Sequence, residues 1–531
     1  MNIRQKPEEI YEEYLRGVEY NESIGLYDTV RRNENFFNDR QWEGVNAPDL
    51  DKPVFNFLKP VVNYYIAMIT SDDIGVEIQP FGQVDEELRD VLQAAAQEVE
   101  RVMENTKIRS KQKRMLRDAA VDGDGCFYLY FDPDIPRGTG EYGEICAENL
   151  ENTQVLFGNP AVDDLQSQPF LLVVQHQPLD LVRRQALKNG IGAAGAEEIQ
   201  PDSLLDPYSL SEDDVVTVIT KFWKEDGTVK LISTTRNQVV RPRADTGYRL
   251  YPLVYFIWER VRHSYHGMAV LTGKISNQIF VNKLYAMAMQ YVKNQAFPKL
   301  LFDRSKIDSW SNRVGDAIAV NGDPSQAVAS SFASRDMSSQ VLQLIDETIS
   351  RTKDLMGASD AALGNINPQN TSAIIAVQKA ASLSLELQKM EFYQFVEDYI
   401  RIFLEMMRVN YGVRRVAFEG PQGDERCRWI DFSRLQDCTW KLNVQIGAAS
   451  YWSELMQVQT LDNLFLNGII DDSIDYLQNV PQGYLRNKNE LIAKLKARRR
   501  EQERAEENKK EHKFYPKEGE RGRKSNDTPG V

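Results

Sequence analysis

The apolar positions of residues 371–411 recur every three to five residues, which is the spacing of one helix face. This segment contains neither proline nor glycine, and as one helix it would span about 60 Å at about 1.5 Å per residue. That is longer than an ordinary globular core needs. We therefore expect the helix to bury its apolar side against neighbouring copies of the chain.

Periodicity predicts the rest of the chain as an α+β protein. The hairpin formed by residues 215–223 and 228–234 is indicated by Asp226-Gly227, because Asp-Gly supplies the positive φ of a tight turn. The other predicted helices are 8–30, 55–70, 84–106, 107–120, 179–188, 265–296, 339–356, 452–466, 473–478 and 487–510. The other predicted strands are 126–131, 142–147, 153–157, 170–175, 253–258, 299–302, 317–320, 415–418, 427–432 and 439–446. Residues 190–206 and 361–370 carry turn-forming residues and are expected to be loops.

The net charge of −14 argues against a protein that coats DNA nonspecifically, because such binding needs Lys and Arg to displace counterions from phosphates. The basic excess lies in residues 484–531, which suit either a solvated helix that leads into a flexible tail or a nucleic-acid arm. The basic helix 107–120 is expected to pack its positive face within the protein rather than on phosphate. No stretch has the length and apolarity of a membrane span, and the polar N-terminus lacks a signal sequence, so we expect an intracellular protein.

No pattern in the sequence predicts a catalytic residue, a metal site or a cofactor. The four cysteines are scattered, and we expect buried, reduced thiols. Residues 122–125 (DGDG) resemble the start of a calcium loop but lack its later ligands, so they predict a turn. His263 and His266 lack further ligands nearby and suit a hydrogen-bonding pair better than a metal site. The sequence contains no GxxxxGK[ST] phosphate loop, so it does not predict an NTPase of that type.

Three motifs then follow one another in a recognisable order. They are residues 35–42 (NFFNDRQW), residues 156–160 (LFGNP) with Asp163 and Asp164, and residues 265–268 (YHGM) with Ile275, Gln278 and Asn282. This order resembles that of tailed-bacteriophage portal proteins of the P22-like podovirus type. The resemblance extends over nearly the whole chain.

The resemblance implies a portal fold with an α/β wing, long stem helices, a small clip with short strands and a helical C-terminal crown. Its implied domains are the wing (1–262), first stem helix (263–296), clip (297–337), second stem helix (338–358), tunnel loop (359–370), long helix (371–412), β return of the wing (413–450), crown (451–510) and flexible tail (511–531). Only about eighty residues follow residue 450, so a long C-terminal barrel is not expected.

The function implied by the resemblance is that of a head-tail connector in the virion, assembled in the host cytoplasm. Twelve copies would form a ring at one capsid vertex, with a channel for genome packaging and ejection. The implied partners are further copies of the chain, double-stranded DNA, the terminase large subunit as packaging ATPase, the head-to-tail adaptor, and the major capsid and scaffolding proteins. Neither enzymatic activity nor a membrane is implied.

Two groups of residues are candidates for facing DNA. The tunnel loop would present Asp360, Gly364, Asn365, Asn367, Gln369 and Asn370. The stem and clip would present Lys274, Lys283, Lys293, Lys299, Arg304 and Lys306. An acidic body with sparse cations suits a channel in which DNA slides, because every phosphate contact adds salt-dependent attraction. For each single cation, a surface or intersubunit salt bridge remains the alternative.

Two other classes of function stay open at this point. One is a nucleic-acid enzyme in which carboxylates such as Asp163, Asp164 and Asp214 bind a divalent metal. The other is a non-portal structural or scaffold protein of the virion, although such a protein has no evident use for the order helix, loop, long helix.

Overall fold

The computed structural model describes two compact units, residues 1–447 and 448–531. The described residues are 3–48, 50–71, 73–137, 142–202, 215–296, 299–307, 309, 319–323, 325, 329–332, 340–358, 383–419, 425–437, 439–447, 451–470, 472–480, 488, 491–492, 494–496 and 498–499. Within them, no helix combines the length and the apolarity that crossing a membrane requires.

The N-terminal part is helical. Its helices are α1 (Pro7–Ser23), α2 (Leu26–Phe37), α3 (Leu58–Ile69), α4 (Glu86–Asn105) and α5 (Ile108–Asp122). The prediction of one helix over residues 8–30 is wrong, because Gly25 adopts a φ of 68° and separates α1 from α2. Asp85 caps α4 by accepting a hydrogen bond from the Leu88 N–H at 2.8 Å.

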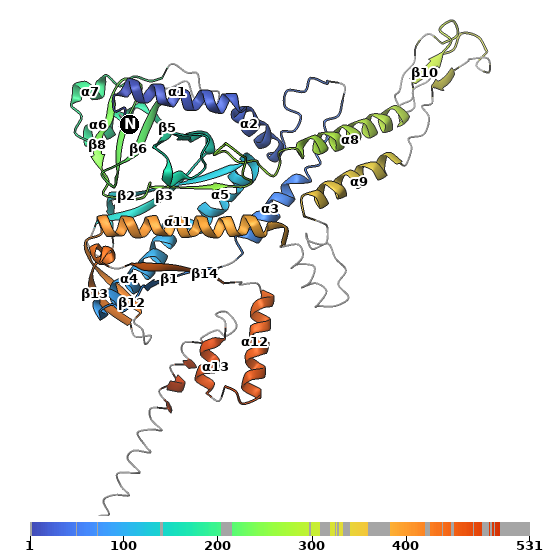
Figure 1. Cartoon of the computed structure of the whole chain (residues 1–531). Coiled ribbons are helices and arrows are strands. Elements are labelled where there is room, and N and C mark those ends of the chain that lie inside the picture. The colour runs from blue at the N-terminus through green and yellow to red at the C-terminus, as the bar shows by residue number, and fades with distance from the viewer. Residues whose placement is uncertain are drawn as a thin grey trace, which may run out of the picture. The chain divides into compact units, whose positions relative to one another are not determined.

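Two antiparallel sheets form the body of the first unit (Figure 1). The three-stranded sheet has the order β3-β2-β9, with β2 (Asp124–Pro136), β3 (Tyr142–Leu150) and β9 (Leu253–Ile257). The five-stranded sheet runs in the order β4 (Val155–Phe157), β5 (Phe170–Pro178), β6 (Val215–Glu225), β7 (Thr228–Thr234) and β8 (Val239–Asp245). The predicted β6–β7 hairpin is confirmed, with Asp226 at φ 55° and Gly227 at φ 79°.

Short helices connect these strands. They are η1 (Asn152–Gln154), η2 (Leu165–Ser167), α6 (Leu179–Lys188) and α7 (Ala193–Glu197). α7 interrupts the segment that was expected to be a loop, residues 190–206. Strand β8 lies outside the predicted strands and completes the edge of the larger sheet.

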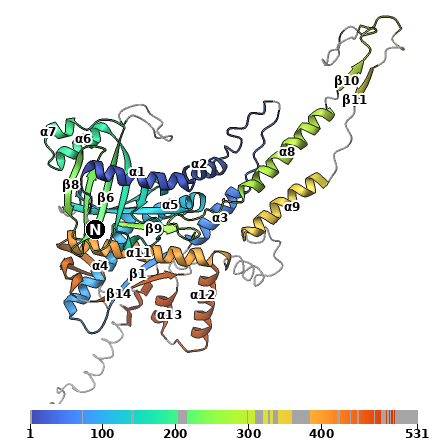
Figure 2. The same ribbon diagram turned by 45° about the horizontal axis from the view of Figure 1, so that its top comes forward.

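Two helices and a two-stranded ribbon project from the body in both views (Figures 1 and 2). They are α8 (Ile275–Ala296), β10 (Lys299–Phe302), β11 (Ala329–Phe332) and α9 (Gln340–Leu355). The predicted helix start at residue 265 is wrong, because residues 265–274 form turns and α8 begins ten residues later. The partner of β10 is β11 and not residues 317–320, of which Val320 forms an isolated bridge with Ile307.

The structure describes the predicted long helix from residue 383 onwards. α11 covers Glu386–Asn410, about 38 Å at about 1.5 Å per residue, and the 3-10 turn η4 (Leu383–Leu385) directly precedes it. Residues 371–382 lie outside the described residues. The expectation that the apolar side of this helix is buried only by neighbouring copies is also wrong. Ten of its side chains are buried within the chain itself, among them Phe395, Tyr399 and Phe403.

The return of the chain to β structure is confirmed. It consists of β12 (Val413–Glu419), β13 (Glu425–Asp431), the 3-10 helix η5 (Phe432–Gln436) and β14 (Trp440–Gly447). β14 pairs antiparallel with β1 (Asp73–Pro80), a strand that periodicity did not predict. In the second unit, α12 (Tyr451–Leu466) and α13 (Ser473–Asn479) are helices as predicted. The predicted helix 487–510 lies mostly outside the described residues.

The largest hydrophobic core of the first unit lies between the three-stranded sheet and the helices that pack on it. Phe395 of α11 lies against Phe127 of β2 and Phe256 of β9, with ring centroids 5.0 and 6.0 Å apart. Side chains of α3, α4, α5 and the start of α8 complete this core. Helix α1 covers the other sheet, where buried Lys221 donates to Glu13 Oε2 at 2.5 Å and to the Arg4 carbonyl at 3.0 Å.

Candidate functional site

The stem, defined here as α8 and α9, is the part that the sequence analysis connected with a channel. The two helices run side by side in both views (Figures 1 and 2). At their base, Asn277 Nδ2 of α8 donates to Thr352 Oγ1 of α9 at 3.0 Å. The Tyr65 hydroxyl of α3 donates to the Met356 carbonyl just beyond α9. Both stem helices are therefore fastened to the body at the same end.

Buried side-chain amides attach α8 to the segment that precedes α3. Gln278 accepts from the Phe57 N–H at 3.2 Å and donates to the Phe55 carbonyl at 2.7 Å. One turn later, Asn282 accepts from Gln278 Nε2 at 3.1 Å and donates to Gln41 Oε1 at 2.5 Å. We call Gln41, Gln278 and Asn282 the amide cluster. It joins the first sequence motif, which contains Gln41, to the last one.

A second buried polar cluster lies where the chain approaches the stem. Nδ1 of His266 lies 2.8 Å from Asp124 Oδ2, and its Nε2 lies 3.1 Å from Asn21 Oδ1. The Gly267 N–H donates to the other Asp124 oxygen at 2.5 Å. His266 is thus hydrogen-bonded as expected, but it does not pair with His263, which lies exposed in a turn at φ 60°.

The turn predicted at residues 122–125 is needed for this arrangement. Gly123 adopts a φ of 109°, and a Cβ atom there would lie 2.5 Å from the Gly267 carbonyl oxygen. Only glycine fits at such a position. β2 begins directly afterwards at Asp124, the residue that holds His266.

The motif at residues 156–160 contacts the same region. The rings of Phe157 and Tyr265 stack with centroids 4.2 Å apart and planes 9° apart. The Tyr265 N–H donates to the Pro160 carbonyl at 3.1 Å, and its hydroxyl donates to the Val155 carbonyl at 3.2 Å. The residues quoted for the resemblance therefore form two neighbouring sets of contacts at the base of the stem.

Away from its base, the stem exposes large apolar side chains. We define the apolar stem surface as Phe280, Met287, Met289 and Val292 of α8 and Leu342 and Leu344 of α9. Met287 is 61% exposed and Val292 is 58% exposed. Near the start of α11, Leu383, Leu387 and Met390 are exposed as well. Exposed apolar patches are typical of surfaces that bind another protein, and these side chains are candidates for such a surface.

The predicted cations of the stem and clip have different surroundings. Lys293 forms an ion pair with Asp51, with Nζ 2.5 Å from Oδ2, so the salt-bridge alternative applies to it. Lys283 and Arg304 are exposed, whereas Lys274 and Lys306 are half-buried. Lys299 lies at the start of β10, and its side chain is outside the described part of the chain. The pairing of Lys293 with Asp51 was not predicted, because no sequence pattern connects residues so far apart.

The predicted tunnel loop lies outside the described residues. This applies to Asp360, Gly364, Asn365, Asn367, Gln369 and Asn370. Their assignment to DNA remains a prediction from the sequence.

The carboxylates considered for a nuclease have structural contacts. Asp163 forms an ion pair with Arg260, and Asp164 accepts from the Gln166 N–H at 3.1 Å, which caps η2. Asp214 lies outside the described residues. Asp163, Asp164 and Asp398 line a cavity of about 360 Å³ together with Arg260 and Arg401. Burial raises the pKa of Asp398. In the described parts of the chain, no three His, Cys, Asp or Glu side chains come together in a group suited to a metal ion.

The basic helix and the cysteines can also be placed. On α5, Arg117 forms ion pairs with Glu34 of α2 and with Asp118. Arg109, Lys113 and Arg114 are exposed, so the expectation that this helix packs its positive face within the protein holds only in part. Cys126 is buried, Cys146 is half-buried and Cys427 is exposed, and all three are free thiols. The expectation of buried thiols is therefore wrong for Cys427 of β13. Cys438 lies outside the described residues.

Comparison with known proteins gives one family. Residues 183–417 match the family model described as phage P22-like portal protein. The matched range begins within α6 and ends in β12, so it contains the stem, strands β10 and β11, and α11. A search of the curated proteins found no match.

Proposed function

We propose that this chain, whose residues 183–417 match the family model described as phage P22-like portal protein, is a portal protein that forms a dodecameric ring at one capsid vertex. The ring would serve as the channel for genome packaging and ejection and as the platform for motor and tail attachment. The proposed location is the virion, with assembly in the host cytoplasm.

The apolar stem surface is the observation that carries this proposal. Phe280, Met287 and Val292 are exposed in a single copy, and moving such side chains from water into a protein contact is favourable by about 25 cal/mol per Å². Repeated copies around an axis would give each stem two neighbours, which can cover these side chains. α11 exposes little apolar surface by comparison, because most of its apolar residues are already buried within the chain.

The proposed channel surface combines an acidic chain with few exposed cations. The net charge is −14, and Lys283 and Arg304 are the candidates that remain exposed and described. Weak phosphate attraction suits DNA that has to slide, because a ring repeats every contact in each subunit. The loop with Asn365, Asn367 and Asn370 is proposed to face the DNA with neutral groups.

The proposed partners follow from what the chain does not supply. Its sequence has no GxxxxGK[ST] phosphate loop, so the terminase large subunit is proposed as the motor. The head-to-tail adaptor, the major capsid protein and the scaffolding protein are proposed as further partners through the portal family.

Imaging of the purified full chain by electron microscopy, together with native mass spectrometry, tests the proposal. We expect annular particles with a central hole and the mass of twelve copies. A folded monomer at every concentration would contradict it, and particles without a hole would favour a scaffold protein. Cleavage of DNA that depends on a divalent metal would favour a nucleic-acid enzyme instead.

A further inference from the structure

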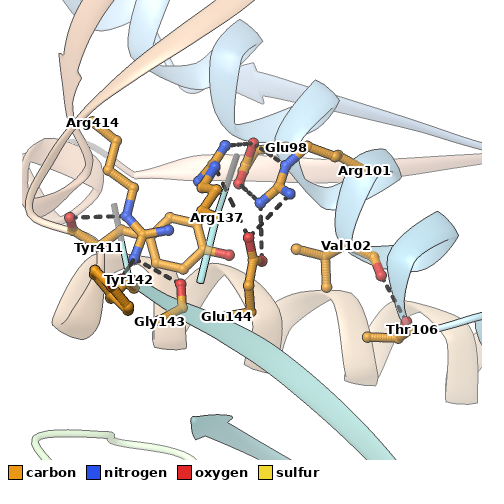
Figure 3. A network of polar contacts seen from close by, with 10 residues as sticks. All are labelled: Glu98, Arg101, Val102, Thr106, Arg137, Tyr142, Gly143, Glu144, Tyr411 and Arg414. Carbon is orange, nitrogen blue, oxygen red and sulfur yellow. Dashed lines mark hydrogen bonds and ion pairs between the residues drawn. The ribbon is translucent and has the colours of Figure 1, made fainter. Parts of the chain in front are cut away.

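A buried ionic network joins α4 to the ends of β2 and β3 (Figure 3). Arg101 and Arg137 share two carboxylates, Glu98 and Glu144. Arg101 Nη2 lies 3.0 Å from Glu144 Oε2, and Arg137 Nη2 lies 3.1 Å from Glu98 Oε2. The Glu98 side chain is 1% exposed and that of Arg137 is 10% exposed. Two positive and two negative groups balance in this part of the network.

A third arginine next to this network has no carboxylate partner among the residues that the structure describes. Arg414, at the start of β12, is 4% exposed. It donates to the main-chain carbonyls of Tyr411 at 3.2 Å, Gly143 at 3.0 Å and Tyr142 at 3.3 Å. Its guanidinium carbon lies 3.7 Å from the centre of the Tyr411 ring. No carboxylate of the residues that the structure describes lies within ion-pair distance of it. Together, the three arginines and two glutamates carry a net charge of +1.

Three donor atoms of this region lack an acceptor. They are Nη1 of Arg137, Nη1 of Arg414 and the hydroxyl of Tyr411, and all three are buried. Figure 3 shows the Arg414 guanidinium against the Tyr411 ring and the Arg137 guanidinium on the Glu98 carboxylate. Burial lowers the pKa of Arg414, and the positive charge of Arg137 lowers it further, so the two groups are close enough to repel. Burial and the nearby Glu98 and Glu144 carboxylates raise the pKa of Tyr411, which keeps its phenol neutral and able to donate.

We propose that a small monovalent anion of the halide class binds between Arg137, Arg414 and Tyr411. Buried polar groups in native proteins nearly always have a hydrogen-bond partner, and a buried charge without a counter-charge is costly. A water molecule could accept these hydrogen bonds but would leave the charge of +1 on the described residues uncompensated. One anion accepts from all three donors and also neutralises the cluster.

The position of this site gives it a structural role. Arg137 follows β2, whereas Tyr411 and Arg414 lie at the junction of α11 and β12, so the anion would hold together two segments that are distant in the sequence. Anything that binds the folded state and not the unfolded state stabilises the folded state in proportion to the logarithm of its concentration. The proposed anion should therefore set the stability of the body independently of ring formation.

Crystals or frozen grids of the full chain prepared in bromide give the direct test. Anomalous diffraction from bromide, or a density too strong for water, is expected between the two guanidinium groups. Density for a carboxylate or for a water molecule at this place would overturn the proposal.

Thermal melting gives the second test, in sodium chloride and in sodium gluconate at equal ionic strength. The wild-type midpoint is expected to be higher in chloride and to rise with chloride concentration. Tyr411→Phe removes one donor while keeping the ring, and it should weaken this chloride dependence. Arg414→Gln should abolish it. Arg401→Gln, a matched control on the surface of α11, should keep the wild-type response. Equal melting of the wild type in the two salts, or an unchanged chloride response in Tyr411→Phe, would contradict the proposal.

Discussion

The ring of Phe395 meets the ring of Phe127 edge-on inside one chain, with centroids 5.0 Å apart and planes at 66°. Phe395 is 2% exposed, whereas Leu387, eight residues earlier on the same helix, is 73% exposed. α11 thus has a C-terminal part that belongs to the core of the chain and an N-terminal end that is available to a neighbour. Folding and assembly can be separated by substitutions along this one helix.

Phe395→Asp is expected to unfold the chain. Truncating a buried Phe costs about 3–5 kcal/mol, and the new carboxylate would be buried without a partner. We expect the loss of the cooperative melting transition, measured by circular dichroism, and not merely the loss of rings. A soluble, folded monomer of this variant would show that the contacts of Phe395 do not hold the core.

Leu387→Asp is the matched variant on the exposed end of α11. Its side chain is mostly exposed, so the free energy of unfolding should change by less than about 0.5 kcal/mol. If neighbouring subunits cover this end of the helix, the fraction of rings should fall. Native mass spectrometry measures that fraction, and an unchanged ring yield would remove Leu387 from the proposed interface.

Gln278→Leu should loosen the attachment of the stem to the body. The substitution keeps the approximate size of the side chain but leaves the Phe57 N–H and the Phe55 carbonyl without their partner. Each buried polar group left unsatisfied costs about 1–3 kcal/mol. We expect a lower melting temperature and faster hydrogen exchange at residues 55–57. Ser276→Ala, on an exposed position of the same helix, is the control and should leave both unchanged.

The carboxyl of Asp122 gives the stability a particular pH dependence. Burial, and then the charge of Glu34, raise the pKa of Asp122 to about 9. The folded chain therefore keeps a proton that the unfolded chain releases above about pH 4. Because the folded state then binds more protons, the free energy of unfolding should fall as pH rises between about 4 and about 9.

Asp122→Asn tests this pH dependence. The amide cannot ionise, so the variant should be more stable than the wild type near pH 8. Its free energy of unfolding should also fall less steeply as pH rises. Urea unfolding at several pH values measures both effects. Asp28 is an exposed carboxylate on α2, and Asp28→Asn should leave the pH dependence of the free energy of unfolding unchanged. A wild type whose stability rises over this range would contradict the assignment.

Local patterns in the sequence predicted most of the elements, since periodicity reports which side of a helix or strand is covered. They failed where apolar spacing resembled a helix but the backbone could not form one. Residues 265–274 have such spacing, yet Gly267 lies against Gly123 and Gly273 adopts a φ of 78°. Those glycines were the feature of the sequence that indicated a break in the helix, as was Gly25 between α1 and α2.

The site was harder to predict, because a pattern shows that a face is buried but not which part of the chain buries it. The apolar spacing of α11 suited either a neighbouring subunit or the core, and the contact of Phe395 with Phe127 decides for the core. The amide cluster likewise joins Gln41 to Asn282, which are 241 residues apart in the sequence. The motifs indicated that these residues matter but not that they touch.

The exposed cations of the stem and clip give a prediction about DNA. If Lys283 faces phosphate in the ring, Lys283→Gln should leave assembly unchanged and reduce the salt dependence of DNA binding by purified rings. For duplex DNA the slope of log affinity against log salt changes by about 0.9 for each phosphate contact. Lys293→Gln is the matched control on the same helix, because Lys293 already pairs with Asp51 of its own chain. Binding titrations at several salt concentrations should therefore separate the two variants. Equal slopes for both variants and the wild type would mean that Lys283 does not contact the DNA.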